Sequence, residues 1–254
     1  MEPQLVLAGL GVGFLIGASG VGSGSLMAPI LLLLGIQPAT IVGSDLAFGL
    51  FTKGAGVGVH ARRGGVRLRW VWLLARGSLP GVVGGSLLVG RLAHSAGTIR
   101  AWIAGMLVLT ALAALSLDFA RRRGAALLTR LQRPRPWVVS LSGLLIGLAA
   151  GATSVGSGAL IDMALLLFSP LRAAEIVGTG LAHGILLSTA GSIVHWNLGT
   201  IDHELVLNLL IGSVPGVLLG SRLAYGFPTL WLRRGIAGLV LLSGLTVLTR
   251  SFFS

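Results

Sequence analysis

Apolar residues run along the chain in eight long segments, and the segments do not show the period-two alternation of a β-strand. The segments are residues 5–35, 39–60, 70–90, 99–118, 137–168, 174–196, 204–224 and 231–251. About 20 apolar residues are enough to cross a hydrocarbon core roughly 30 Å thick. The pattern therefore predicts an all-α polytopic membrane protein, whereas a β-barrel would need alternating segments of about 10 residues.

Two of these segments are too long for a single span. Residues 5–35 and 137–168 would extend for about 46–48 Å as straight helices. Each contains a glycine and hydroxyl block near its middle, GASGVGSG at 17–24 and GATSVGSG at 151–158. Because glycine weakens a helix and serine competes for its backbone hydrogen bonds, the blocks predict a helix break at membrane depth.

The same blocks reveal an internal duplication. IVGSDLAFG at 41–49 matches IVGTGLAHG at 176–184, and GSLPGVVGGS at 77–86 matches GSVPGVLLGS at 212–221, both at an offset of 135. His60 falls on His195 at this offset. The register predicts two homologous transmembrane repeats, residues 1–118 and 137–254, joined by a basic cytoplasmic linker at 119–136.

Composition supports the membrane assignment and narrows the function. The chain is 54% hydrophobic and 10% charged, with a mean hydropathy of +0.92. The net charge of +12 comes from arginines at the ends of apolar runs, so positive-inside orientation explains it and nucleic acid is not expected as a partner. The chain has no cysteine and no nucleophile elbow, HExxH motif or P-loop, so neither an enzyme nor a bound metal or cofactor is expected.

Two topologies fit the eight segments. If each long segment crosses once, the halves are parallel and Lys and Arg divide 11 to 6 between the two sides. If each folds back as a hairpin, the second half is inverted and the division becomes 14 to 3. The positive-inside rule favours the inverted repeats with hairpins.

Inverted repeats with broken helices are typical of secondary transporters, whose substrate site lies where the breaks meet. Helix N-termini at such breaks present unpaired N–H groups to an anion, and serine is a favoured N-cap. The block residues expected to bind substrate are Ser19, Gly22, Ser23, Gly24, Ser25, Thr153, Ser154, Gly156, Ser157 and Gly158. The alternative is that the glycines only allow close helix packing.

Three charged residues lie within apolar segments, where an unpaired charge is costly: Asp45, Lys53 and Asp162. We expect Lys53 to bind the anion and Asp45 or Asp162 to couple transport to protons. The alternatives are that Lys53 extends to the membrane surface, that Asp45 caps its helix, and that Asp162 stabilises the first turn of its half-helix. The repeated His60 and His195 are candidates for gating or proton relay.

Together, the two breaks, the IVG(S/T)xLAxG blocks, the histidine at the end of the following helix and the GS(L/V)PG blocks resemble the sulfite exporter TauE/SafE family. The resemblance extends over nearly the whole chain. It implies a multi-pass transporter of the bacterial inner membrane for small sulfur-containing anions such as sulfite or organosulfonates. It also implies that Ser44 and Thr179 line the pore.

The chain departs from the family pattern at Asp45, at Asp162 and at residues 64–67, which read GGVR where the second repeat has GTID. The extra carboxylates keep a proton-coupled cation or metal carrier open as a rival, using Asp45, Asp162, His60 and His195. A membrane-embedded enzyme acting on a lipid is a second rival. The sequence does not indicate an oligomeric state.

Overall fold

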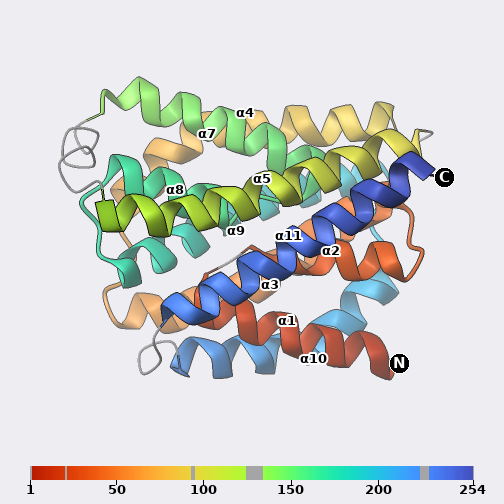
Figure 1. Ribbon diagram of the computed structural model, residues 1–254, viewed down its shortest axis with the longest axis horizontal. Coiled ribbons are helices and arrows are strands. Elements are labelled where there is room, and N and C mark those ends of the chain that lie inside the picture. Colours follow the sequence, from red (N-terminus) through yellow and green to blue (C-terminus); the bar gives the residue numbers. More distant parts are fainter. Residues whose placement is uncertain (1, 21, 93–94, 124–133, 224–228, 254) are drawn as a thin grey trace.

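The computed structural model describes residues 2–20, 22–92, 95–123, 134–223 and 229–253 (Figure 1). Within these ranges the chain is helical and contains no strand, as the apolar pattern predicts. The helices are α1 (Pro3–Ser19), α2 (Ser23–Leu33), α3 (Pro38–Arg62), α4 (Leu68–Arg91), α5 (Ala96–Arg123), α7 (Pro136–Thr153), α8 (Ala159–Phe168), α9 (Ala173–Asn197), α10 (His203–Leu223) and α11 (Thr229–Phe253).

Five of the described helices are long and apolar enough to cross a membrane: α4, α7, α9, α10 and residues 96–116 of α5. The described part of the chain is therefore a multi-pass helical protein. Helix α5 continues to Arg123, five residues into the predicted linker, and residues 124–133 of that linker lie outside the described residues.

Both over-long segments are broken where the glycine blocks predict. The first divides into α1 and α2, of 17 and 11 residues, and the second into α7 and α8, of 18 and 10 residues. Gly20 and Ser154, at equivalent positions, both turn left-handed with φ of 75° and 57°. This conformation ends a helix at little cost for glycine, whereas serine adopts it only when the surrounding structure holds it there.

Glycine rows bring the halves together. Gly9, Gly13 and Gly17 of α1 lie against the backbone of Leu209, Ser213 and Val217 of α10, and Gly77, Gly81 and Gly85 of α4 lie against that of Ser140, Leu144 and Leu148 of α7. A Cβ at these glycines would overlap the opposite backbone. Close helix packing therefore accounts for these glycines, of which only Gly17 belongs to a glycine and hydroxyl block.

The glycine rows also interlock the two repeats. Helix α1 of the first half packs most extensively on α10 of the second, and α7 of the second half packs most extensively on α4 of the first. Figure 1 shows the α1–α10 pair and the α4–α7 pair at opposite edges of the molecule, with α3, α5, α9 and α11 between them. The repeats therefore do not form two separate bodies.

The relative directions of the helices follow from these contacts. Residues of α1 and α10 meet in ascending order, so the two helices run parallel. Helix α3 also runs parallel to α10, because Thr52 bonds to Ser213 and Gly56 lies against Val217. Since α1 and α3 share one direction, α2 returns between them, and α1 and α2 form a hairpin.

The second half repeats this hairpin in the opposite direction. Helices α4 and α7 run parallel, and α9 follows them, because Ser78 bonds to His183 and Val82 lies against Gly191. Helix α8 therefore returns between α7 and α9. Helices α9 and α10 are joined by a short loop and run in opposite directions. Because α9 is parallel to α7 and α10 is parallel to α1, α7 runs opposite to α1. These directions are those that the hairpin interpretation requires, while the orientation relative to a membrane stays a prediction.

A Gly13→Ala substitution should lower the free energy of unfolding by roughly 1–3 kcal/mol, because its Cβ overlaps the Ser213 backbone. Thermal unfolding in detergent measures the effect. Gly11→Ala in the same helix is the matched control, since a Cβ there meets nothing within 4 Å. Equal stability of the two variants would contradict the glycine packing.

Single cysteines at Ser95 and Asn197 should react with a membrane-impermeant maleimide from the same side, and a cysteine at Ala173 from the opposite side. The native chain has no cysteine, so each label is unambiguous. Labelling of Ser95 and Asn197 from opposite sides would contradict inverted repeats.

Candidate substrate site where the two helix breaks meet

The two breaks pack against each other in the centre of the molecule. A Cβ at Gly22 would stand 2.7 Å from the backbone nitrogen of Gly158 and 3.0 Å from Ser157 Oγ, and one at Gly24 would overlap the Ser154 backbone. Gly22 and Gly158 are the N-cap residues of α2 and α8. The positive ends of two helix dipoles therefore converge.

The serines are not the caps that the sequence predicts. Helix α2 begins at Ser23 itself, and Ser157 precedes the N-cap Gly158 of α8. Neither N-cap makes a side-chain capping bond, because both caps are glycines. The hydroxyls of Ser23 and Ser157 are instead available to the charged side chains of α3.

Lys53 extends into this junction from α3. Its side chain is 2% exposed, and its Nζ donates to Ser157 Oγ at 3.3 Å and to Ser188 Oγ at 3.0 Å. Ser188 on α9 is the repeat equivalent of Lys53 at the offset of 135. The ammonium thus lies where equivalent positions of the two halves touch, and the alternative that Lys53 reaches the membrane surface is wrong.

Asp45 lies two turns earlier on α3. It is completely buried, and its Oδ2 accepts a hydrogen bond from Ser23 Oγ at 3.1 Å. Its Oδ1 has no hydrogen bond within 3.5 Å among the described residues, but the Ser154 hydroxyl of the second break also interacts with this carboxylate. Asp45 is the eighth residue of α3 and therefore does not cap it. Its charge attracts that of Lys53, which offsets part of the cost of burying both groups.

Two equivalent glycines leave room around the ammonium. A Cβ at Gly49 would stand 2.8 Å from Ser23 Oγ and 3.2 Å from both Lys53 Nζ and Ser188 Oγ. A Cβ at Gly184 would stand 3.0 Å from Lys53 Cδ. Side chains at either position would therefore compete with the ammonium for the same space.

The other predicted hydroxyls fall into two groups. Ser19 donates to the Leu15 carbonyl and Thr153 to the Ala149 carbonyl, so both bond within their own helices. The Oγ atoms of Ser25 and Ser154 are both buried; that of Ser25 has no hydrogen-bond partner in the described chain, whereas Ser154 interacts with the Asp45 carboxylate. Gly156, with φ of 93°, shapes the turn of the second break.

Ser44 and Thr179 hold connecting loops in place. Ser44 Oγ accepts from the Asp202 N–H at 2.9 Å, and Thr179 Oγ1 accepts from the Arg67 N–H at 3.0 Å. The two bonds are equivalent in the repeat. Ser44 joins the first half to the loop before α10, and Thr179 joins the second half to the loop before α4. The implied pore-lining role of the two hydroxyls stays a prediction.

The repeated histidines are buried rather than exposed at the surface. His60 interacts with the backbone of Gly17, and His195 with that of Gly151, so each contacts the last turn of the helix that ends at one of the breaks. His195 Nδ1 also lies 2.7 Å from Thr200 Oγ1. These contacts join the end of α3 to α1 and the end of α9 to α7. Gating by the two histidines stays a prediction.

Two residues of the site are absent from the sequence prediction. Ser188 holds Lys53, and His183 is buried on α9 with its Nε2 2.7 Å from Ser78 Oγ, near the charge of Lys53. The repeat equivalent of His183 is Phe48, so the internal duplication does not mark this histidine. The repeat offset was the available signal for Ser188, because it aligns this serine with a buried lysine.

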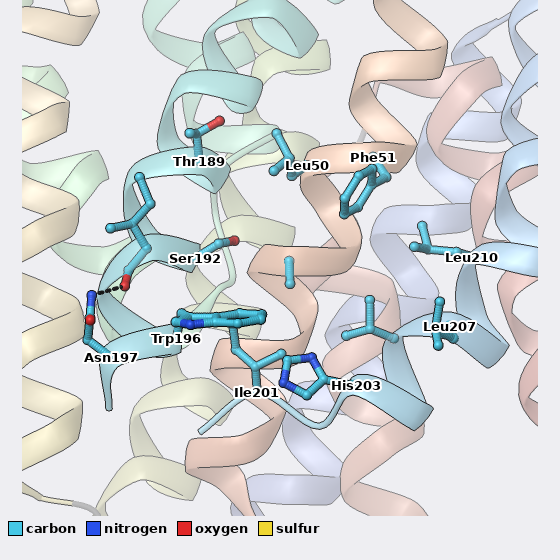
Figure 2. A pocket seen from close by; sticks show the side chains of 13 residues that line it. Leu50, Phe51, Thr189, Ser192, Trp196, Asn197, Ile201, His203, Leu207 and Leu210 are labelled. Atoms are coloured by element: carbon cyan, nitrogen blue, oxygen red, sulfur yellow. Dashed lines mark hydrogen bonds between the residues drawn. The ribbon is translucent and has the colours of Figure 1, made fainter. Parts of the chain in front are cut away.

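A separate groove lies on the outside of the helices. Figure 2 shows it between α3, α9 and α10, with Phe51, Trp196 and Leu207 in its wall, and its volume is about 610 Å³. The Trp196 and His203 rings are 4.8 Å apart at one end. Because the wall is mostly apolar and the large side chains are exposed, the groove is suited to hydrocarbon rather than to an anion.

The chain also matches known proteins. A family profile described as "Sulfite exporter TauE/SafE" matches residues 5–247. The chain belongs to the sulfite exporter TauE/SafE family. It is therefore a membrane transporter rather than an enzyme, and a multi-pass protein of the bacterial-type cytoplasmic (inner) membrane.

Relatives from Bacillus subtilis (strain 168) match the chain from end to end. The probable membrane transporter protein YjnA is 37% identical over 98% of this chain and all of its own length. The probable membrane transporter protein YdhB is 28% identical over 94% of this chain and 97% of its own. No solved structure matches the chain.

The buried charges should depend on each other for stability. Asp45→Asn and Lys53→Met alone each leave one buried charge without its counter-charge, at a cost of about 3–5 kcal/mol. The double variant should cost less than the sum of the single variants by at least about 1 kcal/mol, measured by unfolding in detergent. Additive losses would show that the two charges do not interact.

Proposed function

We propose that the protein is a secondary transporter that moves a small sulfur-containing anion, of the sulfite or organosulfonate class, by alternating access. One observation carries this proposal: the Lys53 ammonium is bonded to Ser157 and Ser188 at the junction of the two breaks. Asp45 offsets part of the cost of burying this ammonium, and an arriving oxyanion would accept charge-assisted hydrogen bonds from it. The family membership supports a transporter, and its name supports the sulfur oxyanion.

The junction offers several donors to an oxyanion. The N-termini of α2 and α8 converge there, and the first turn of a helix has N–H groups without an intrahelical acceptor, although the Leu160 N–H of α8 already donates to the Gly156 carbonyl. The hydroxyls of Ser23, Ser154 and Ser157 lie within the same breaks. A tetrahedral or pyramidal oxyanion could accept from both helix ends and from Lys53 at once.

Alternating access requires two units that move relative to each other around this site. The repeats themselves interlock through α1–α10 and α4–α7, so we propose that these two glycine-packed pairs are the rigid units. Helix α3 packs on α10 and α9 packs on α4, and the two meet at Lys53 and Ser188. A small rocking of α3 against α9 would open the site to alternate sides.

Asp45 and Asp162 are the proposed proton-coupling groups, and His60 and His195 the proposed gates. An alternative is a proton-coupled cation carrier, which is favoured by the buried carboxylate of Asp45 between the two breaks. Within the described residues, no three His, Asp or Glu side chains come together as a metal site. The nearby ammonium of Lys53 would also repel a cation, so the anion carrier is our first choice.

The experiment is flux of sulfite and of methanesulfonate in proteoliposomes. Lys53→Met should reduce saturable flux at least about tenfold, because hydrogen bonds to a charged group contribute roughly 1.5–3 kcal/mol. Gly49→Ala should also reduce flux, since its Cβ takes the space beside the ammonium without changing any charge. Gly54→Ala, on the same helix and with nothing within 4 Å, is the matched control.

Wild-type flux of either anion in folded Lys53→Met would overturn the assignment of Lys53. Absence of anion flux in the wild-type protein, together with cation flux that Asp45→Asn abolishes, would replace the anion carrier by the cation carrier. Product formation from lipid in detergent would instead indicate the enzyme.

A further inference from the structure

The Asp45 carboxylate lies between the two helix breaks and contacts a hydroxyl from each of them. Its Oδ2 accepts a hydrogen bond of 3.1 Å from Ser23 Oγ, at the first residue of α2. The hydroxyl of Ser154, in the second break, also interacts with this carboxylate. Asp45 itself belongs to neither break, because it is on α3. One buried anionic group of the chain therefore joins both breaks.

The same carboxylate is the counter-charge of Lys53. Gly49 lies one turn from each of them on α3, and a Cβ there would stand 2.8 Å from Ser23 Oγ and 3.2 Å from Lys53 Nζ. The hydroxyl that holds Asp45 and the ammonium that attracts it thus adjoin the same glycine. Asp45 already receives the hydroxyl donors and the positive charge that the proposed function offers to an arriving oxyanion.

The internal repeat shows that the scaffold does not require this carboxylate. Ser157, the equivalent of Ser23 at the offset of 134, holds the Lys53 ammonium instead of an acid. The equivalent of Asp45 on α9 is Gly180, and Asp162, in the first turn of α8, lies against that glycine. The acid at position 45 is therefore an addition to the duplicated backbone.

The backbone of Ser154 indicates that its hydroxyl has a use beyond the turn. Among the residues that the structure describes, Ser154 alone has a positive φ without being glycine, and its repeat equivalent is Gly20. Glycine would make this turn without strain, so the turn itself does not explain a serine. The contact with the Asp45 carboxylate does explain it.

We infer that Asp45 is an internal competitor of the substrate, whose carboxylate occupies the donors of both breaks until an oxyanion takes them over. This inference rests on the proposed function. Two anions cannot share the same donors at short range without repelling each other. Removal of the carboxylate charge should therefore tighten anion binding, whereas loss of a residue that binds the substrate would weaken it. The role differs from proton coupling, because the ionised carboxylate competes without transferring a proton.

The first test supplies the missing carboxylate from solution. Asp45→Ala vacates the space of a carboxylate, and formate is the ion of that size and shape. We expect formate to raise the unfolding temperature of Asp45→Ala in detergent by at least about 3 °C, because a ligand that binds the folded state stabilises it. The wild-type protein should shift much less, since its own carboxylate fills the site. Asp45→Ala/Lys53→Met is the matched control, with the same space but no ammonium.

The contribution of the second break is tested in the same background. Ser154→Gly relieves the strained turn and removes the hydroxyl. Formate should therefore stabilise Asp45→Ala/Ser154→Gly less than it stabilises Asp45→Ala. Equal stabilisation would remove Ser154 from the contact.

The second test keeps the side-chain shape and removes only the charge. Asp45→Asn should bind methanesulfonate at least about tenfold more tightly than the wild-type protein, because the anion no longer competes for charge-assisted hydrogen bonds. Calorimetry on the purified protein measures the affinity. Gly54→Ala, which has nothing within 4 Å of its added Cβ, should keep the wild-type affinity.

Formate that shifts Asp45→Ala no more than Asp45→Ala/Lys53→Met would overturn the inference. Methanesulfonate binding to Asp45→Asn that is equal to or weaker than wild-type binding would overturn it too. If Asp45→Ala does not fold, the affinity of Asp45→Asn decides. Absence of anion flux in the wild-type protein would count against the proposed function instead, and the formate titration would still decide whether an anion replaces the Asp45 carboxylate.

Discussion

Backbone that leaves helical geometry at membrane depth must find partners inside the protein, and this constraint organises the whole structure. Two breaks, one between α1 and α2 with Gly20 and Gly22 and one at residues 154–158, satisfy it by packing against each other. Glycine at positions 22 and 24 allows that approach because any side chain would overlap the opposite break. The same approach brings two helix N-termini together and creates a region of partial positive charge. Such a region would be unfavourable in contact with the lipid hydrocarbon, so it lies inside the protein.

Glycine has a second use in this chain, which is to build the frame around the breaks. The rows on α1, α4, α7 and α10 let backbones approach to the distance at which only a hydrogen atom fits between them. In a bilayer, where burial of apolar side chains provides little driving force, such close contact is the main source of helix association. The rows also join helices from different repeats, so the frame belongs to both halves and α3 and α9 cross within it.

The symmetry of the backbone contrasts with the asymmetry of its charges. Lys53 faces Ser188, Asp45 corresponds to Gly180, and Asp162 corresponds to Ala28. Two equivalent lysines would repel each other where the halves meet, whereas one lysine and one serine form a hydrogen bond. In each pair of repeat-equivalent positions, only one residue is charged. A site where the two halves meet therefore avoids repulsion between like charges, which lowers the cost of burying it.

The sequence by itself determined the helical membrane class, the position of both breaks and the family, and it predicted the two repeats, because apolar length, glycine blocks and a shared offset can be read without a fold. It also marked Asp45, Lys53 and Asp162, since charge within an apolar segment is visible without a fold. The interpretation of the breaks as serine-capped was wrong, because capping depends on which residue adopts the non-helical turn.

Only the tertiary structure decided which partners these residues have. It placed Lys53 against Ser188, Asp45 against Ser23 and Asp162 against Gly180, and it assigned Ser44 and Thr179 to loop contacts. It also separated the glycines that pack helices from those that join the breaks. These outcomes depend on how α1 and α10, α4 and α7, and α3 and α9 pack across the chain, and no local pattern encodes which helix faces which.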